Sequence, residues 1–388
     1  MNTNDIITKT NDNIMNTYAR LPISIKSGKN ATVYDNDGKK YIDLTSGIGV
    51  TALGHCDQEW IDAVKSALDT PSHTSNYFYS ESSALLAEQL VNITDMSKAF
   101  FCNSGAEANE CAIKLARKYS FDKYGKGRSN IITLKKSFHG RTLTTLSATG
   151  QDKFHNYFFP FTEGFIFIEP ELEQLKKASD NTVCAVMIEC IQGEGGINVL
   201  DKKLVQKLAE FLAEHDILLI VDEVQTGIGR TGSFLAIQQY GVCPDIVTIS
   251  KSLGGGLPIG ATLCNEKLSK ALKPGDHGST FGANPICCAA GLALVKKIND
   301  IDFYSEITKK GEYIKEKLAI NKNITNIRGM GLMIAFDIPG SAREMLSELA
   351  AKGVLCLTAG DSMRLLPALT ISTEEIDEGI SIIINSVK

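Results

Sequence analysis

The sequence predicts an α/β fold in which a mostly parallel sheet is covered by helices on both faces. Short, largely apolar runs recur along the chain, and helical stretches separate them. Strands buried on both faces read as continuous apolar runs, and alternation with helices is typical of parallel sheets. The runs are Asn130–Leu134, Val183–Ile188, Ile217–Val221 and Ile246–Ile249.

The elements around these runs follow from local patterns. Residues 204–213 carry apolar residues on one helical face, which predicts a helix between two of the strands. Near the N-terminus, Asp37-Gly38 separates two alternating runs and predicts a hairpin over residues 30–45. After a helix at Ala289–Ile298, we expect a smaller α/β segment in which Gly329–Phe336 forms one strand. We therefore expect a large domain at residues 46–288 and a small domain built jointly from residues 1–45 and 289–388.

Composition narrows the class of protein. The chain has 388 residues and a formal net charge of −5, which argues against an extended nucleic-acid interface. Its 10 cysteines form no Cys-x-x-Cys pair, so we expect no zinc ribbon, no other metal site and no thioredoxin-like chemistry. The N-terminal residues are polar, and no apolar stretch is long enough to span a bilayer. We expect a cytoplasmic protein without a nucleic-acid or membrane partner.

An acid and a lysine follow two of the predicted strands. Asp222 comes directly after Ile217–Val221, and Lys251 comes just after Ile246–Ile249 and before the glycines 254–256. Ligands of parallel sheets bind at the carboxyl ends of the strands, so one site would hold both side chains. Pyridoxal phosphate requires this pair, a lysine for the imine and an acid beside the pyridine nitrogen. The plainer interpretations are a surface lysine and a strand-end helix cap, and the pairing argues against them.

The segment Asn103–Glu110 opens a helix. Ser104 and Glu107 have the spacing of a capping box. The free N–H groups of such a helix start and its dipole favour an anion, so the segment is either a phosphate-binding site or simply a capped helix.

An aromatic residue and an arginine, Phe138 and Arg141, lie just beyond the strand at Asn130–Leu134. Phe138 could stack on a planar ring, and Arg141 could bind a carboxylate with two hydrogen bonds. The alternative is a core phenylalanine beside a surface arginine.

These motifs, in this order, resemble those of the class III aminotransferases, which belong to the fold-type I branch of pyridoxal-phosphate enzymes. The resemblance covers nearly the whole chain, from Tyr18–Pro22 to Asp361–Pro367. Within the class the sequence is most similar to the N-acetylornithine aminotransferases. That likeness rests on five further motifs, Thr51–His55, Ile191–Gly196, Gly227–Gly232, His277–Gly282 and Ile327–Leu332.

The resemblance implies a role for each motif residue. Lys251 would hold pyridoxal phosphate as an imine, and Asp222 would face its ring nitrogen. The other cofactor contacts would come from Gly105 and Ala106 at the phosphate, Phe138 on the ring face, Val224, Gln225 at the ring hydroxyl and Thr280 on the phosphate of a dimer partner. The substrate contacts would come from Arg141, Ser279 and a switch pair of Glu194 with Arg364.

The function implied by the resemblance is transfer of the terminal amino group of N2-acetylornithine to 2-oxoglutarate, by a homodimer of arginine biosynthesis. The succinyl-diaminopimelate, succinylornithine, ornithine-δ and 4-aminobutyrate aminotransferases share this chemistry and remain alternatives. An aminomutase or a non-catalytic cofactor-binding protein would also keep Lys251. Two residues depart from the family pattern, Cys190 where proline is common and Phe281 where tyrosine is common.

Overall fold

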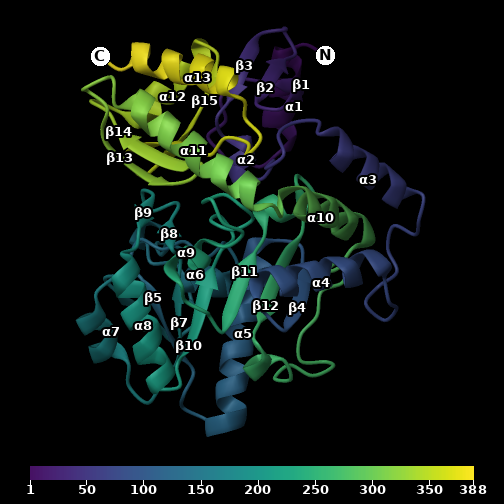
Figure 1. Cartoon of the computed structure of the whole chain (residues 1–388), viewed down its shortest axis with the longest axis vertical. Helices are drawn as coiled ribbons and strands as arrows, with labels where there is room; N and C mark the ends of the chain where they lie inside the picture. Colours follow the sequence, from purple (N-terminus) through teal and green to yellow (C-terminus); the bar gives the residue numbers. More distant parts are fainter.

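The computed structural model describes all 388 residues, and a seven-stranded sheet forms its centre (Figure 1). Its strands are β4 (Lys98–Cys102), β5 (Asn130–Leu134), β6 (Phe165–Ile168), β7 (Val183–Ile188), β10 (Leu218–Asp222), β11 (Ile246–Ile249) and β12 (Gly260–Cys264). In space they follow the order β4-β12-β11-β10-β7-β5-β6. Every pair from β11 to β6 is parallel, whereas β12 runs antiparallel to both β11 and β4. The predicted α/β fold with a mostly parallel sheet is confirmed.

Both faces of this sheet are buried, which explains its unbroken apolar strands. Along β7, Val186 and Ile188 belong to the larger buried cluster, while Met187 belongs to a second cluster on the opposite face. The helix α5 (Gly105–Tyr124) contributes to the second cluster, and α8 (Lys202–Glu214) contributes to the larger one. Alternating side chains of one strand therefore pack on different helices.

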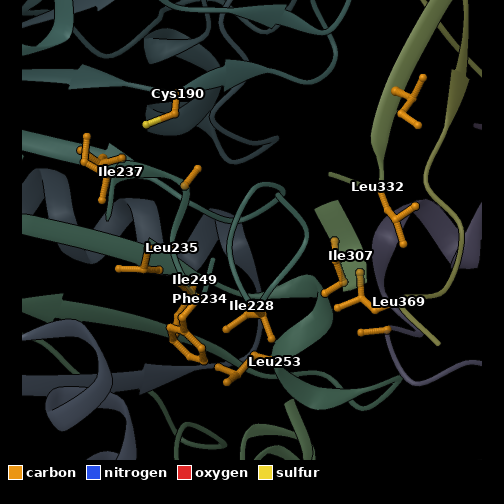
Figure 2. Close-up of a cluster of buried hydrophobic side chains, with 14 of the residues drawn as sticks. Cys190, Ile228, Phe234, Leu235, Ile237, Ile249, Leu253, Ile307, Leu332 and Leu369 are labelled. Atoms are coloured by element: carbon orange, nitrogen blue, oxygen red, sulfur yellow. The ribbon is translucent and has the colours of Figure 1, made fainter. Parts of the chain in front are cut away.

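The larger cluster continues from the sheet into the C-terminal part of the chain (Figure 2). Figure 2 shows Ile228, which follows β10, on the side of the cluster nearest Ile307 and Leu369. Leu253, which follows β11, and Leu332 belong to the same cluster. This shared apolar core fixes the strand-end loops against the C-terminal elements.

The two ends of the chain meet in small sheets. The N-terminal strands β1 (Ile25–Lys29), β2 (Thr32–Asp35) and β3 (Lys40–Asp43) form one sheet with β15 (Val354–Leu355). A second sheet holds β13 (Thr325–Met330), β14 (Met333–Asp337), β16 (Leu357–Ala359) and β17 (Ser362–Leu365), and a third holds β8 (Ile191–Gln192) and β9 (Asn198–Val199). The antiparallel pairing of β2 with β3 confirms the predicted hairpin. We propose that the large domain spans residues 46–288 and that the flanking segments form the small one.

The remaining helices cover these sheets, and none combines the length and the apolar character that a membrane span requires. They are α1 (Thr3–Asn13), α2 (Ser46–Gly49), α3 (Gln58–Leu68), α4 (Glu81–Thr94), α6 (Leu143–Ala148), α7 (Leu172–Ala178), α9 (Ala236–Tyr240), α10 (Pro285–Ile298), α11 (Ile301–Leu318), α12 (Ala342–Ala351) and α13 (Thr373–Ser386). Short 3₁₀ turns lie at Asp152–Phe154, Lys251–Gly254 and Glu266–Leu268.

One predicted strand was wrong. Residues 329–336 do not form a single strand, because β13 ends at Met330 and β14 begins at Met333. The two strands pair antiparallel, with Met330 opposite Met333. Gly331, between them, has φ +53°, a conformation that glycine adopts without strain and that reverses the chain. The apolar run therefore crosses a hairpin turn.

Candidate active site

A cavity of about 240 Å³ opens at the carboxyl ends of the parallel strands. Asp222 ends β10, Lys251 follows β11, Phe138 and Arg141 follow β5, and Glu189 follows β7. These ends share one edge of the sheet, so residues distant in sequence meet there. The lining residues are Gly105, Ala106, Asn109, Phe138, His139, Gly140, Arg141, Glu189, Asp222, Val224, Gln225, Ser250 and Lys251. Eight of the residues that the sequence singled out are among them: Gly105, Ala106, Phe138, Arg141, Asp222, Val224, Gln225 and Lys251.

Lys251 occupies a constrained position at the wall of the cavity. Its backbone has φ +38°, which is strained for a residue with a side chain. The turn that carries it is anchored on both sides, since Ser252 Oγ donates to Gly49 O at 2.7 Å and Trp60 Nε1 donates to Gly254 O at 3.2 Å. Burial lowers the pKa of Lys251, although the charges of Glu194 and Asp222 oppose this shift. A lowered pKa increases the share of neutral amine, the nucleophilic form.

Asp222 is buried and held by three donors. Its Oδ2 lies 2.8 Å from Asn109 Nδ2 and 2.8 Å from His139 Nδ1, while its Oδ1 accepts from Val224 N at 3.0 Å. An ionised carboxylate only accepts, so His139 Nδ1 carries the proton. The Oδ1 atom has one donor and Oδ2 has two, which leaves Oδ1 with free acceptor capacity.

The N-terminus of α5 forms another wall of the cavity. Ser104 caps the helix by accepting from Glu107 N at 3.2 Å, and the first intrahelical bond runs from Ala108 N to Ser104 O. The N–H groups of Gly105 and Ala106 therefore have no partner within the helix. The Glu107 carboxylate turns back to Asn103 N at 2.9 Å and does not line the cavity. This helix start can accept an anion.

Close packing at Gly105 supports that interpretation. A Cβ atom at this position would lie 2.6 Å from Val224 Cγ1, so only glycine allows the helix start to approach the segment after Asp222 this closely. A lysine, an acid, a helix N-terminus and an aromatic ring thus surround one cavity. This donor set fits pyridoxal phosphate.

Phe138 and Arg141 lie on the loop after β5. The Phe138 N–H donates to Glu189 Oε2 at 2.9 Å, which fixes the start of the loop. The Arg141 guanidinium lies 4.4 Å from the centre of the Phe154 ring and 5.5 Å from that of Phe138. Arg141 is exposed and forms no ion pair, so its charge is free to bind an anion.

Glu194 and Arg364 form an ion pair beside the cavity. Arg364 Nη1 lies 2.6 Å from Glu194 Oε1 and 3.3 Å from Gln225 Oε1, and Gln225 lines the cavity. Burial alone would raise the pKa of Glu194, but the charge and hydrogen bond of Arg364 outweigh it and lower that pKa. The pair therefore stays charged and neutralises itself near neutral pH.

Ser279 and Thr280 lie outside the cavity of their own chain. Ser279 Oγ accepts from Asn103 Nδ2 at 3.1 Å and from Gly282 N at 3.0 Å. Thr280 is exposed, and no side chain of this chain bonds its hydroxyl.

The sequence analysis assigned no role to four polar residues of the cavity. One of them, Ser250, donates its hydroxyl to Ile259 O at 2.8 Å. Asn109 and His139 bond Asp222, and Glu189 bonds the Phe138 loop. Burial raises the pKa of Glu189 well above its ordinary value, and the charge of Asp222 adds to this effect. Asn109 and His139 lie inside motifs that the sequence marks, but their contacts depend on the tertiary fold.

Comparison with known proteins finds one matching family model and several similar proteins. The profile of the family described as "Aminotransferase class-III" matches residues 14–387. An acetylornithine aminotransferase of Haemophilus ducreyi is 48% identical over 374 residues, which are 95% of each chain. The acetylornithine aminotransferase of Methanocaldococcus jannaschii is 44% identical over 93% of this chain and 92% of that protein.

Solved structures of aminotransferases have the same fold as this chain. The ornithine aminotransferase of Toxoplasma gondii superposes with a TM-score of 0.95 at 31% identity, covering 100% of this chain and 95% of that one. The N-acetylornithine aminotransferase of Stenotrophomonas maltophilia has a TM-score of 0.85 at 33% identity, with 98% and 97% covered. The similarity extends over the whole length of the cavity-bearing chain.

Proposed function

We propose that this chain, which belongs to the class III aminotransferases, moves the terminal amino group of N2-acetylornithine to 2-oxoglutarate. The products would be N-acetylglutamate 5-semialdehyde and glutamate, a step of arginine biosynthesis. The family match confirms the resemblance found in the sequence, and the chain is a pyridoxal-phosphate-dependent aminotransferase. The choice of acetylornithine is supported by the relatives that bear that name at 39–48% identity.

Lys251 would have two tasks. When bound, pyridoxal phosphate supplies an aldehyde that takes up an amine and a ring that stores electrons. The neutral Nζ of Lys251 would hold the cofactor and then take and return the proton at the substrate carbon that bears the amine. Its lowered pKa supports both tasks, because each requires an amine without a proton.

The other walls would hold the cofactor at its remaining edges. The N–H groups of Gly105 and Ala106 would bind the phosphate, and Phe138 and Val224 would enclose the ring. Asp222 would accept a hydrogen bond from the protonated ring nitrogen. Its Oδ1 has the capacity for this bond, because Asn109 and His139 both bond Oδ2. Gln225 would reach the ring hydroxyl.

The arrangement of the two arginines carries the substrate proposal. Arg141 has no carboxylate partner, whereas Arg364 is paired with Glu194. With the pair closed, the site offers one free cation, which suits a donor with one distant carboxylate and a neutral region near the reacting amine. With the pair open, Arg364 would accept the second carboxylate of glutamate or 2-oxoglutarate. Ser279 would assist at the far end of the substrate.

We also infer that two copies of the chain complete the site. Tyr77, Phe78, Tyr79 and Phe281 form an exposed aromatic patch, which is typical of a protein interface. Asn76 Nδ2 donates to Gly282 O at 2.9 Å, which connects the segment that carries Tyr77–Tyr79 to the segment that carries Phe281. Thr280 lies beside it, which supports a contact from Thr280 to the phosphate of the partner subunit. The ten free cysteines favour the reducing cytoplasm as the place where the dimer works.

A panel of amino donors tests this proposal. Purified protein with pyridoxal phosphate and 2-oxoglutarate is given acetylornithine, succinyl-diaminopimelate, succinylornithine, ornithine or 4-aminobutyrate, and glutamate formation is measured. We expect the highest kcat/KM with acetylornithine. A higher value with any other donor would replace acetylornithine by that donor. Absence of glutamate with all five would refute the proposed substrates.

A further inference from the structure

A buried hydrogen-bonded chain passes behind the cavity and joins four elements of the site. Thr248 Oγ1 on β11 lies 2.7 Å from Asn109 Oδ1 on α5. Asn109 Nδ2 lies 2.8 Å from Asp222 Oδ2 and 2.7 Å from His139 O. His139 Nδ1 closes the chain on the same Asp222 oxygen at 2.8 Å. All four residues are at least 96% buried.

We propose that Asn109 is a positioning residue that orients Asp222 toward the cofactor's ring nitrogen, and that Thr248 fixes the orientation of the Asn109 amide. The inference rests on the proposed role of Asp222. Asn109 itself would touch no reacting atom. Its effect on the reaction would pass through the carboxylate that it holds.

The hydrogen-bond partners determine how the Asn109 amide is oriented. Its Nδ2 faces two acceptors, the Asp222 carboxylate and the His139 carbonyl. A flipped amide would place its oxygen against both acceptors, so the buried His139 carbonyl would lose its donor and Asp222 Oδ2 would keep only His139 Nδ1. In the observed orientation the Thr248 hydroxyl donates to Oδ1, so every polar atom of the amide has a partner.

Asn109 also links the two ends of the cofactor site. It lies four residues after Gly105, hence on the same face of α5, one turn below the N–H groups proposed to bind the phosphate. The phosphate and the ring nitrogen belong to one rigid molecule, so the helix start and Asp222 must keep a constant separation. A hydrogen bond from α5 to Asp222 fixes that separation directly.

The simpler alternative is that Asn109 only satisfies buried polar groups and supports the fold. The two interpretations differ in what a variant does to recognition of the ring nitrogen. Asn109→Asp keeps the shape but places a second carboxylate against Asp222. The like charge favours a shared proton, and a protonated Asp222 is a poor acceptor for the pyridinium N–H. Loss of fold support would instead weaken every contact to the cofactor alike.

Binding of two cofactors to the apoenzyme separates these cases. The probes are pyridoxal phosphate and its 1-deaza analogue, in which the ring nitrogen is replaced by a carbon. Trp60 is the only tryptophan of the chain, and its indole donates to Gly254 O at 3.2 Å, three residues after Lys251. Quenching of Trp60 fluorescence therefore reports the dissociation constant of each probe without measuring turnover.

We expect wild-type protein to bind pyridoxal phosphate more tightly than the analogue. In Asn109→Asp this preference should fall at least about tenfold, which corresponds to about 1.4 kcal/mol. In Thr248→Val, which removes only the hydroxyl that orients the amide, it should fall about threefold. Thr133→Val is the matched control, because Thr133 is a buried strand threonine of the same sheet whose hydroxyl has no partner. Its preference should equal that of wild type.

Each other outcome overturns the inference. If Asn109→Asp weakens both probes by the same factor, Asn109 only supports the fold. If Asn109→Asp does not fold, as judged by its thermal transition, Thr248→Val decides, and an unchanged preference in that variant refutes the proposal. If wild-type protein does not distinguish the two probes, Asp222 does not recognise the ring nitrogen, and the proposed role of Asp222 fails together with that of Asn109.

Discussion

Arg364 Nη1 lies 2.6 Å from Glu194 Oε1, in an ion pair that joins β17 to the loop between β8 and β9. The arginine side chain is 4% exposed and the glutamate side chain 32% exposed, so the carboxylate can move toward solvent more easily than the guanidinium. A buried arginine that loses its carboxylate becomes a strong anion site. We propose that the pair opens by movement of Glu194 rather than of Arg364.

Replacing Glu194 by alanine should shift substrate preference. Arg364 would then bind an α-carboxylate near the reacting amine at all times, which favours glutamate over acetylornithine. We expect the ratio of their half-reaction rates to move at least about tenfold toward glutamate, or about 1.4 kcal/mol. Stopped-flow absorbance of the cofactor measures both rates.

Two further variants test whether a shift in this ratio comes from the Glu194–Arg364 pair. Arg364→Ala should move the same ratio in the opposite direction. Glu378→Ala breaks a different ion pair, that with Lys40 at 2.7 Å, whose residues do not line the cavity, and should leave the ratio unchanged. Equal losses of both half-reaction rates in Glu194→Ala would mean that the pair supports the fold or the cofactor and does not select substrates.

Lys251→Ala should lower turnover at least about a thousandfold, because it removes both the covalent and the proton-transfer role. Steady-state glutamate formation measures this loss, and circular dichroism should show an intact fold. Lys135→Ala is the control, since Lys135 also follows a strand but lies at the surface and pairs with Glu169 at 3.0 Å. Residual activity above a thousandth of the wild-type rate would refute the proposed role of Lys251 in cofactor binding and proton transfer.

Asp222→Asn should bind pyridoxal phosphate and transaminate at least about a hundredfold more slowly. A neutral amide can no longer stabilise a protonated ring nitrogen, so charge that develops at the substrate carbon is less well dispersed. Single-turnover rates with saturating cofactor test this. Asp201→Asn, a change at the N-cap of α8 where either residue serves, should be silent. Near-normal rates in Asp222→Asn would show that another group protonates the ring.

Much of this architecture is visible in the sequence because strand burial and strand ends leave strong patterns. The unbroken apolar runs predict β5, β7, β10 and β11, and their carboxyl ends bring Asp222 and Lys251 to one edge. The strand β12 was not predicted. Its residues 260–264 include a glycine and a threonine, and its antiparallel direction depends on the preceding turn and on pairing with β4.

The positioning contacts of the site lie beyond local patterns. Asn109 and Asp222 are 113 residues apart, and His139 and Asp222 are 83 residues apart. Their motifs predict a helix start and a strand-end loop, but not the rotation that brings an amide and an imidazole onto one carboxylate oxygen. Such contacts follow only from the packing of α5 against the sheet.

The exposed aromatic patch should disappear into a dimer interface. Phe281→Glu places a charge in this patch, and we expect it to lower the molecular mass in analytical ultracentrifugation to that of one chain and to reduce activity at least about tenfold. Loss of activity should follow because Thr280 can no longer reach the partner's site. Phe121→Glu changes an exposed phenylalanine on α5 outside the patch and should remain dimeric. A fully active monomer would contradict the shared site.

Glu223 should make the stability of the protein depend on pH. This carboxyl is fully buried beside Asp222, and burial, with a smaller effect of the Asp222 charge, raises its pKa to about 7 despite hydrogen bonds from Thr226 and the Ile237 N–H. A carboxyl whose pKa is higher in the folded than in the unfolded protein contributes stability that is complete below its unfolded pKa. That contribution is lost as the pH rises through the folded pKa.

The loss from Glu223 alone, between pH 4.5 and values above 7, amounts to about 3 kcal/mol of unfolding free energy. Glu223→Gln keeps a partner for both hydrogen bonds and removes the titration, so its stability relative to wild type should increase from pH 5 to pH 8. Midpoints of urea unfolding for both proteins across this range measure the difference. Glu210→Gln, on the exposed face of α8, should follow wild type throughout. A difference between Glu223→Gln and wild type that stays constant with pH would show that Glu223 keeps the same protonation state in the folded and unfolded chain.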